Sequence, residues 1–352
     1  MKYLELGRSA MKVSEFCLGA MTFGEEFGIG APASECRQIY DAFIDAGGNF
    51  IDTANIYNRG TSEKMLGEFV GSERDYLVLA SKYSLSTNPQ DPNAGGNHRK
   101  NLVQSLETSL KNLQTDYLDL YWVHGWDQST PLVEMMRALD DQVRAGKILH
   151  AGISNAPAWV VAAANTLAVE RGWTAFTAVQ LHYNFVERSI ETDFLELADA
   201  HDMAVTAWSP LAGGLLTGKF DPDAAEAARQ GARLQASPRG ARILTERNLQ
   251  LSRELSRIAA DAGCSPAQLA LAWLRQRATT IVIPIIGARN AAQLEDNLGA
   301  AAVELPSQLI DELDRLSAPL LSYPRSLLDS EFFQTMMFGQ RRAERRHPRG
   351  RR

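Results

Sequence analysis

Four side chains that could act together on a carbonyl group stand at or just after the ends of three short apolar runs. Asp52 lies in the run 50–53 and Tyr57 follows shortly after it, while Lys82 and His124 directly follow the next two runs. A tyrosine with an ordinary pKa of about 10 is a weak acid at neutral pH. An adjacent lysine ammonium favours the phenolate and lowers that pKa, and a buried lysine needs a carboxylate as its counter-ion. The residue types therefore predict that Tyr57 donates a proton, that Asp52 and Lys82 form its supporting ion pair, and that His124 orients the carbonyl oxygen by a hydrogen bond.

Each of these residues also has an ordinary structural explanation. Alone, Asp52 would be a cap or turn residue, Lys82 a surface charge and His124 a hydrogen-bonded core histidine. Four titratable groups at the ends of three successive runs are harder to explain in that way. Proton donation supplies no reductant, so the predicted chemistry also needs a bound hydride carrier.

Eight apolar, strand-like runs alternate with amphipathic, helix-like segments along the chain. The runs lie at residues 16–20, 50–53, 77–81, 117–123, 148–153, 178–181, 203–208 and 281–286. The helical segments lie at 34–46, 62–71, 100–113, 132–145, 157–171, 191–201, 246–262 and 290–298, with an additional helix at 265–278 before the last run. Parallel strands need helix-length connections, and eight such units close a barrel. The pattern predicts an α/β fold, a (β/α)8 TIM barrel with the polar residues at the carboxyl ends of its strands.

The remaining segments suggest how the chain is organised around this barrel. Residues 3–14 fit a hairpin that plugs the barrel floor, and long connections at 84–99 and 213–245 follow strands, where active-site loops belong. We expect the barrel to span 1–322 as one domain. Residues 323–339 are apolar enough to pack on the barrel rim or against another subunit, which is consistent with a homo-oligomer. Residues 340–352 are expected to be a basic, disordered tail.

Composition and charge limit the classes of function. The 352 residues are 45% hydrophobic and 22% charged, as in an ordinary globular protein. Residues 340–352 carry seven Arg and one Glu, a net charge of +6; because the whole chain carries −6, the remainder carries −12. An acidic body gives no reason to expect nucleic acid as a partner. No signal peptide or membrane-length apolar run is present, so we expect a cytoplasmic protein without a membrane partner.

The sequence gives no indication of a metal site or a disulfide framework. The three cysteines, Cys17, Cys36 and Cys264, are far apart and lack CxxC spacing, so they are expected to be reduced thiols. His124 has no second histidine or carboxylate at ligand spacing, which disfavours a metal-dependent hydrolase.

A different dinucleotide site is formally present but weak. Residues 28–33 match the spacing G-x-G-x-x-G/A, and Asp52 lies 19 residues beyond Ala33, where a ribose ligand would be expected. However, charged residues rather than an apolar strand precede Gly28, and Pro32 stands inside the proposed turn. A Rossmann fold would also leave Tyr57 and the late strands without a role, so we disfavour it.

Six motifs together resemble the aldo-keto reductase superfamily. They are NFIDTANIY (49–57), LVLASK (77–82), DLYWVH (119–124), GISN (152–155), AWSPLAGGLLTGK (207–219) and IPIIGARNAAQLEDN (283–297). The resemblance covers about residues 3–318 and is closest to the bacterial branch related to potassium-channel β subunits. It implies NADPH-dependent reduction of an aldehyde or ketone, with Tyr57 as general acid and Asp52, Lys82 and His124 completing a catalytic tetrad. It leaves open a different class of function, an NADPH-binding regulatory subunit with negligible turnover.

The resemblance also assigns residues to the cofactor. For the nicotinamide end they are Met21, Asp52, Ser154, Asn155, Gln180 and the stacking Trp208. For the pyrophosphate they are Ser209, Pro210, Leu211, Gly213 and Lys219, and for the adenosine end Gly287, Arg289, Gln293, Asp296 and Asn297. Phe23, Tyr83 and Trp126 are the candidate substrate-pocket residues. Arg289 near a helix amino terminus favours NADPH over NADH because a guanidinium can bind the 2′-phosphate, although it could equally pair with a carboxylate.

Overall fold

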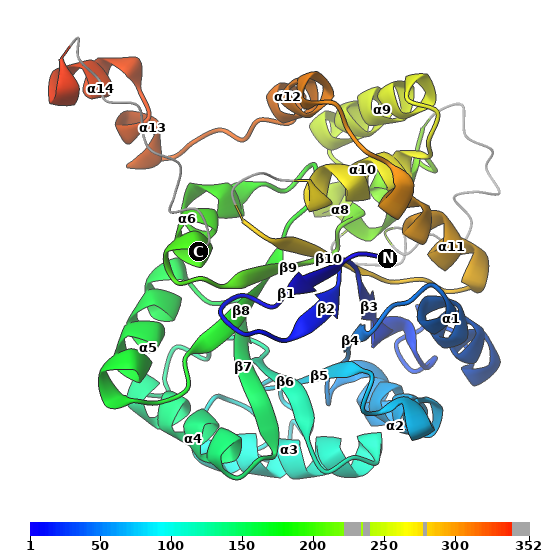
Figure 1. Ribbon diagram of the computed structural model, residues 1–352, viewed down its shortest axis with the longest axis vertical. Coiled ribbons are helices and arrows are strands. Elements are labelled where there is room, and N and C mark those ends of the chain that lie inside the picture. The colour runs from blue at the N-terminus through cyan, green and yellow to red at the C-terminus, as the bar shows by residue number, and fades with distance from the viewer. Residues whose placement is uncertain (222–233, 235–239, 277–279, 340–352) are drawn as a thin grey trace.

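Eight parallel strands close into a barrel in the order β10-β3-β4-β5-β6-β7-β8-β9 (Figure 1). The computed structural model describes residues 1–221, 234, 240–276 and 280–339. The strands are β3 (Cys17–Gly19), β4 (Phe50–Asp52), β5 (Val78–Tyr83), β6 (Leu118–Val123), β7 (Ile148–Ser154), β8 (Phe176–His182), β9 (Ala204–Trp208) and β10 (Val282–Ile286). The predicted (β/α)8 barrel is confirmed, and each predicted run coincides with one strand.

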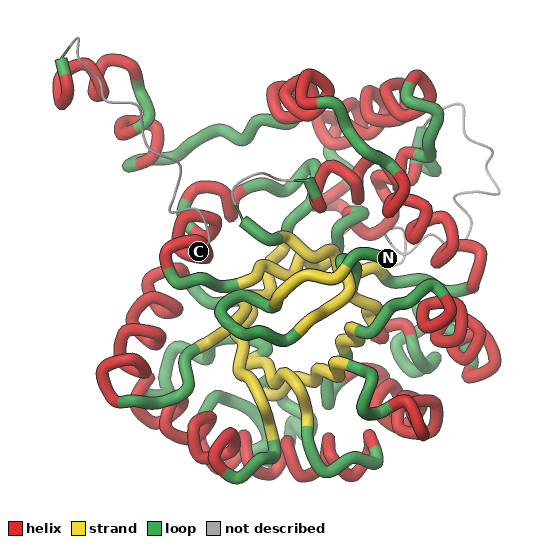
Figure 2. The backbone as a smooth tube through the Cα atoms, viewed as in Figure 1, coloured by secondary structure: helices red, strands yellow, loops and turns green. Residues whose placement is uncertain are grey.

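Helices form an outer ring around the strands (Figure 2). The helices of the described residues are α1 (Ala33–Asp45), α2 (Thr61–Val70), α3 (Arg99–Leu113), α4 (Leu132–Arg144), α5 (Ala158–Arg171), α6 (Phe194–Ala200), α8 (Gly240–Ile243), α9 (Glu246–Asp261), α10 (Pro266–Arg275), α11 (Ala291–Gly299) and α12 (Ser307–Leu316), and beyond the ring α13 (Arg325–Leu328) and α14 (Glu331–Phe338). The additional helix predicted before the last strand is α10. It begins at a capping box, in which Ser265 and Gln268 exchange side-chain-to-backbone hydrogen bonds of 3.1 and 3.2 Å. Helices α8 and α12 to α14 were not predicted.

Side chains along each strand alternate between the barrel interior and the layer beneath the helices. The interior is filled by a buried apolar cluster that includes Phe50, Leu120 and Trp122. The antiparallel hairpin of β1 (Tyr3–Glu5) and β2 (Lys12–Ser14) closes one end, where Leu6 and Val13 join this cluster. The expected floor plug is therefore present. Because the interior is packed with apolar groups, polar chemistry is confined to the opposite end, at the strand carboxyl termini.

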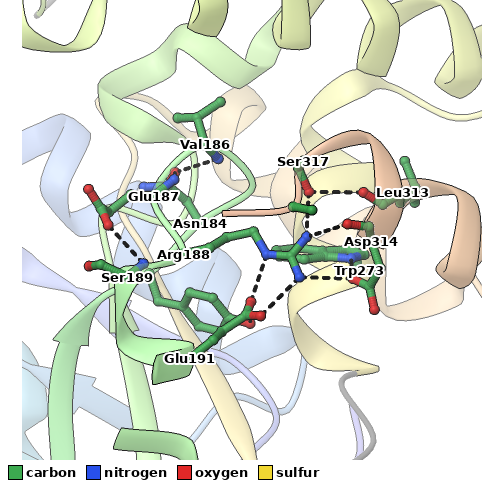
Figure 3. A network of polar contacts seen from close by, with 12 residues as sticks. Asn184, Val186, Glu187, Arg188, Ser189, Glu191, Trp273, Leu313, Asp314 and Ser317 are labelled. Carbon is green, nitrogen blue, oxygen red and sulfur yellow. Dashed lines mark hydrogen bonds and ion pairs between the residues drawn. The ribbon is translucent and has the colours of Figure 1, made fainter. Parts of the chain in front are cut away.

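A buried polar network ties the carboxyl-terminal helix α12 to the barrel (Figure 3). The Arg188 guanidinium, after β8, donates to both carboxylate oxygens of Glu191 at 2.7 and 2.9 Å. It also donates to the Asp314 carbonyl oxygen at 2.9 Å and to Ser317 Oγ at 2.7 Å, and it lies over the Trp273 ring. The loop that follows β8 and the end of α12 are thereby fixed to each other.

The segment after α12 leaves the barrel. Residues 323–339 project away from it rather than over its rim (Figures 1 and 2), so the first of the two placements expected for this extension is not seen. Arg325 of α13 pairs with Glu196 on the outer helix α6, at 2.8 Å. The basic segment 340–352 and much of the connection 213–245 lie outside the described residues. Within the part of the chain that the structure describes, no helix is both long enough and apolar enough to cross a membrane.

Candidate active site

Lys82 is the centre of a polar cluster at the carboxyl ends of β4 and β5. Its side chain is fully buried, and its Nζ donates to the Asp52 carboxylate, to the Thr53 carbonyl oxygen at 2.7 Å and to Tyr57 Oη at 3.1 Å. Asp52 and Lys82 both face the barrel interior. The three residues that the sequence analysis grouped by type are thus brought into direct contact.

Tyr57 is presented by a short turn that the sequence stabilises. It begins the 3-10 helix η2 (Tyr57–Gly60), in which Asn58 and Arg59 take left-handed φ values of 45° and 55°. Asn58 Nδ2 donates to the carbonyl oxygens of Met21 and Phe23 at 3.0 and 2.9 Å. Asparagine tolerates this conformation better than most residues. Asn58, which directly follows Tyr57, therefore stabilises the turn that places the phenol beside Lys82.

Electrostatics keep the Lys82 ammonium charged despite its burial. Burial by itself lowers the Lys82 pKa, but the attraction of Asp52 and Tyr57 outweighs it and raises the pKa above its ordinary value. For Asp52, burial raises the pKa, while Lys82 and a 3.1 Å hydrogen bond from Gln180 Nε2 oppose that rise. The result is a buried ion pair with a cation within hydrogen-bond distance of the phenol oxygen.

His124 lies on the other side of Tyr57. The two rings meet edge to face, with centroids 5.7 Å apart. Burial and the repulsion of Lys82 lower the pKa of His124 to about 3, so the imidazole is neutral at physiological pH. Its Nδ1 is buried and has no hydrogen-bond partner among the described residues. A neutral imidazole carries one N–H, which can donate to a carbonyl oxygen.

The residues expected at the nicotinamide end gather around the ends of β7, β8 and β9. Asn155, at a left-handed φ of 48°, donates to the His124 carbonyl oxygen at 2.8 Å and to Ser154 Oγ at 2.9 Å. Gln180 is buried and bound to Asp52. The Trp208 indole stacks on the His182 ring, with centroids 4.1 Å apart and planes 7° apart, and its buried Nε1 has no partner among the described residues.

The loop after β9 forms a turn that brings backbone N–H groups and a lysine together. Ser209 has a φ of 55° and its Oγ accepts from Gly213 N at 3.2 Å, while Pro210 is buried and Leu211 half-buried. Gly213 and Gly214 both have positive φ, and a Cβ at Gly214 would lie 2.8 Å from Lys219 Nζ. Burial and the nearby Arg289 both lower the pKa of Lys219. Two cations from different loops therefore lie near each other, as an anionic ligand would require.

The residues expected at the adenosine end lie at or near α11. Asn290 caps the helix by accepting from Gln293 N at 2.9 Å, and Gln293 Oε1 accepts from Arg289 N at 3.0 Å. Asn297 Nδ2 is 3.5 Å from the Gly287 carbonyl oxygen, which closes the turn between β10 and α11. Asp296 accepts from Gln268 Nε2 at 3.0 Å, which gives it a structural role in joining α10 and α11.

Two of the expected substrate-pocket residues need correction. Tyr83 is fully buried and stacks on Tyr121, with centroids 5.4 Å apart, because it follows the inward-facing Lys82 and so points outward beneath the helices. Phe23 is also fully buried and packs edge-on against Phe69 of α2. Trp126 differs from both, since it is half-buried beside Asn155, whose carbonyl oxygen accepts its backbone N–H at 3.3 Å.

The Rossmann alternative does not fit this geometry. Residues 28–32 lie in the loop before α1, which begins at Ala33, and the strand β3 ends nine residues before Gly28 rather than running into it. Asp52 is bound to Lys82 and Gln180 instead of standing near that loop.

Comparison with known proteins decides the family. Residues 15–318 match the model of the aldo/keto reductase family. The chain is 37% identical over 330 residues to norsolorinic acid reductase of Emericella nidulans, covering 91% of this chain and 82% of the relative. It is 35% identical over 316 residues to an aryl-alcohol dehydrogenase of Pestalotiopsis microspora, covering 87% and 79%.

The chain belongs to the aldo/keto reductase family. It is therefore an oxidoreductase, as the sequence motifs implied. The narrower expectation, a bacterial branch related to potassium-channel β subunits, is not supported, because these similar proteins are fungal. An aldo-keto reductase of Emericella nidulans is likewise 35% identical over 331 residues, covering 88% of this chain and 81% of the relative.

Two aromatic contacts near this aldo/keto reductase site were missed from the sequence. His182 stacks on Trp208, and Trp159 meets Trp126 edge to face, with centroids 5.4 Å apart. His182 follows Gln180 by two residues, so strand alternation alone could have placed it on the same face. Trp159 lies in the first turn of α5, and no local pattern distinguishes it from other exposed helix residues.

Proposed function

We propose that this protein reduces an aldehyde or ketone to an alcohol with NADPH, and that Tyr57 donates the proton to the carbonyl oxygen. The observation that carries the proposal is the buried Lys82 ammonium, which contacts both the Asp52 carboxylate and Tyr57 Oη. An ion pair in the apolar interior would be costly if it served only packing. Its position beside a half-exposed phenol gives it a chemical role.

The side chains divide the work on the carbonyl group. Bound NADPH supplies the hydride that the carbonyl carbon accepts. Tyr57 gives its proton to the oxygen, and Lys82 stabilises the phenolate that remains. Asp52 keeps Lys82 charged, and the neutral His124 donates a hydrogen bond that holds the carbonyl oxygen near Tyr57.

The charges at the far side of the site fit a phosphorylated dinucleotide. Lys219 and Arg289 lie close enough that Arg289 lowers the Lys219 pKa. Phosphate groups would relieve this repulsion, and the amino terminus of α11 adds backbone N–H groups that favour anions. We assign Lys219 to the pyrophosphate and Arg289 to the 2′-phosphate that distinguishes NADPH from NADH. Ser154, Asn155, Gln180 and Trp208 would hold the nicotinamide end.

An aromatic carbonyl compound is the substrate class that we favour. The similar fungal proteins are named for norsolorinic acid and aryl alcohols. In this chain, Trp126 and Trp159 form an aromatic pair beside Asn155, near His124. Flat aromatic rings pack well against indole faces and edges, which supports the same class.

The conservative substitution Tyr57→Phe tests the proposal. It removes one hydroxyl, so kcat with an aromatic aldehyde should fall about a thousandfold, while the NADPH Kd should change less than about twofold. Tyr83→Phe is the matched control, because it removes the same atom from a buried tyrosine outside the site. Equal turnover by Tyr57→Phe and the unmodified protein would remove Tyr57 from the mechanism. Tight NADPH binding without oxidation by any carbonyl would instead favour a regulatory subunit.

A further inference from the structure

The carboxyl-terminal extension, residues 323–339, and the residues just before it carry many exposed apolar side chains. Phe332 and Met336 of α14 are each 70% exposed and Met337 is 61% exposed. The other exposed members are Leu320, Leu321, Tyr323, Leu327, Leu328 and Phe338. Apolar groups gathered on one short segment mark an interaction site more often than scattered ones do.

The contacts within one chain are too weak to hold this extension in place. Arg325 pairs with Glu196 of α6 and with Asp329, but exposed ion pairs contribute little stability. An eight-residue helix such as α14 is marginal in water unless its apolar side chains pack against something. The barrel of the same chain does not provide that surface, since the extension projects away from it (Figure 1). The extension therefore needs a covering surface from outside its own barrel.

The charge distribution of the chain indicates which surface covers the extension. Residues 340–352, directly after the extension, carry a net charge of +6. The stretch 187–202, which includes α6 and the Glu196 partner of Arg325, contains six acidic residues and one Arg. A second copy of this chain thus offers an acidic surface to the basic segment. An anionic lipid surface would instead be repelled by that stretch and by a body of charge −12.

The available area is sufficient for a two-fold contact. Three exposed aromatic residues (Tyr323, Phe332 and Phe338) and two exposed methionines could bury on the order of 600 Å² per copy. Two copies contributing equally reach roughly 1,200 Å², the lower limit for a specific interface. Methionine and aromatic side chains are also enriched in such interfaces.

We propose that the extension is a dimerisation arm. The α14 helices of two copies pack reciprocally through Phe332 and Met336. This proposal does not depend on the function proposed above, because none of these residues belongs to the site around Lys82.

Sedimentation velocity of the full chain over a range of concentrations tests the arm. The unmodified protein should dimerise, and Phe332→Glu combined with Met336→Glu should raise the dimer Kd at least about tenfold. Val169→Glu is the matched control, because Val169 is a similarly exposed (63%) apolar residue on α5 and should leave dimerisation unchanged. Circular dichroism and turnover of both variants report that the barrel is folded.

The contribution of charge to the dimer is tested by varying the salt concentration. Raising NaCl from about 0.05 to 0.5 M should weaken the dimer of the full chain, since salt screens exposed charges. A chain ending at residue 339 should show a smaller change. A monomer at all concentrations, a dimer that the α14 substitutions leave intact, or binding of the monomer to vesicles of anionic lipid would each overturn the proposal.

Discussion

At the residue scale, Lys82 shows how a cation can be retained inside a barrel. Its ammonium has three acceptors, and it is the Asp52 carboxylate that compensates its charge. The same pair affects the stability of the fold, because burying each charged side chain costs desolvation free energy. That cost is compensated while both charges are present.

The losses of stability on removing the two charges should therefore not be additive. Asp52→Asn and Lys82→Met should each lower the free energy of unfolding by roughly 3 kcal/mol, because each leaves a buried charge without its partner. The double variant should lose clearly less than the two single losses combined. Urea denaturation of the four proteins measures this coupling, and the exposed pair Lys2–Glu304 is the control, with a coupling below about 1 kcal/mol. Strict additivity at positions 52 and 82 would contradict the ion pair.

His124 predicts a pH dependence of stability. Its folded-state pKa is about 3, against an ordinary value of 6.5, through burial and the repulsion of Lys82. Between these values the unfolded chain binds a proton here and the folded protein does not, so stability is lost as pH falls from 6.5 toward 3. The unfolding free energy should drop by up to about 1.4 kcal/mol per pH unit from this group. Urea denaturation of the unmodified protein and of His124→Gln at pH 8, 6 and 5 isolates the contribution of this histidine. The difference between their unfolding free energies should change below pH 6.5. A difference that stays constant with pH would refute the lowered pKa.

Residue types and strand ends were enough to predict the cluster around Lys82, because the carboxyl ends of parallel strands meet at one end of a barrel. The direction of each side chain required the strand register as well. Tyr83 was a candidate pocket residue, yet it directly follows the inward-facing Lys82, and consecutive residues of a strand face opposite sides. The stacking of His182 on Trp208 depends on the pairing of β8 with β9, which no local pattern specifies.

At the element scale, the strand–helix alternation predicted every barrel strand, since a buried parallel strand and an amphipathic helix have distinct periodicities. It did not predict α12, which follows the eighth unit and is held by long-range contacts. Arg188 lies 126 residues before Asp314, so the network that attaches α12 cannot be seen in either segment alone.

That attachment can be measured by removing the guanidinium. Arg188→Met keeps most of the side-chain length but removes a buried cation from the partly buried Glu191, so the unfolding free energy should fall by roughly 3 kcal/mol. Arg257→Met is the control, because Arg257 pairs with Glu254 and Asp261 on the surface of α9 and its loss should cost below about 1 kcal/mol. Equal losses in urea denaturation would mean that Arg188 does not anchor α12.

At the scale of the whole molecule, the family and the barrel are established, whereas the cytoplasmic location and the behaviour of residues 340–352 stay predictions. The dinucleotide preference also belongs to this scale, because its residues come from two loops that the pairing of two strands brings together. Lys219 follows β9 and Arg289 follows β10, and these two strands are neighbours in the barrel.

A ligand that binds only the folded barrel raises its stability by mass action, which makes the preference measurable without turnover. At about 100 times its Kd, NADPH should add about 2.7 kcal/mol, equivalent to a Tm increase of roughly 3–4 °C for a chain of this length. Arg289→Ala should weaken NADPH at least about tenfold but leave NADH unchanged, because NADH lacks the 2′-phosphate. Arg253→Ala, on the exposed side of α9, is the control and should leave both titrations unchanged. If Arg289→Ala weakened both dinucleotides equally, Arg289 would contact a group that they share, and the basis for preferring NADPH would have to lie elsewhere in the barrel.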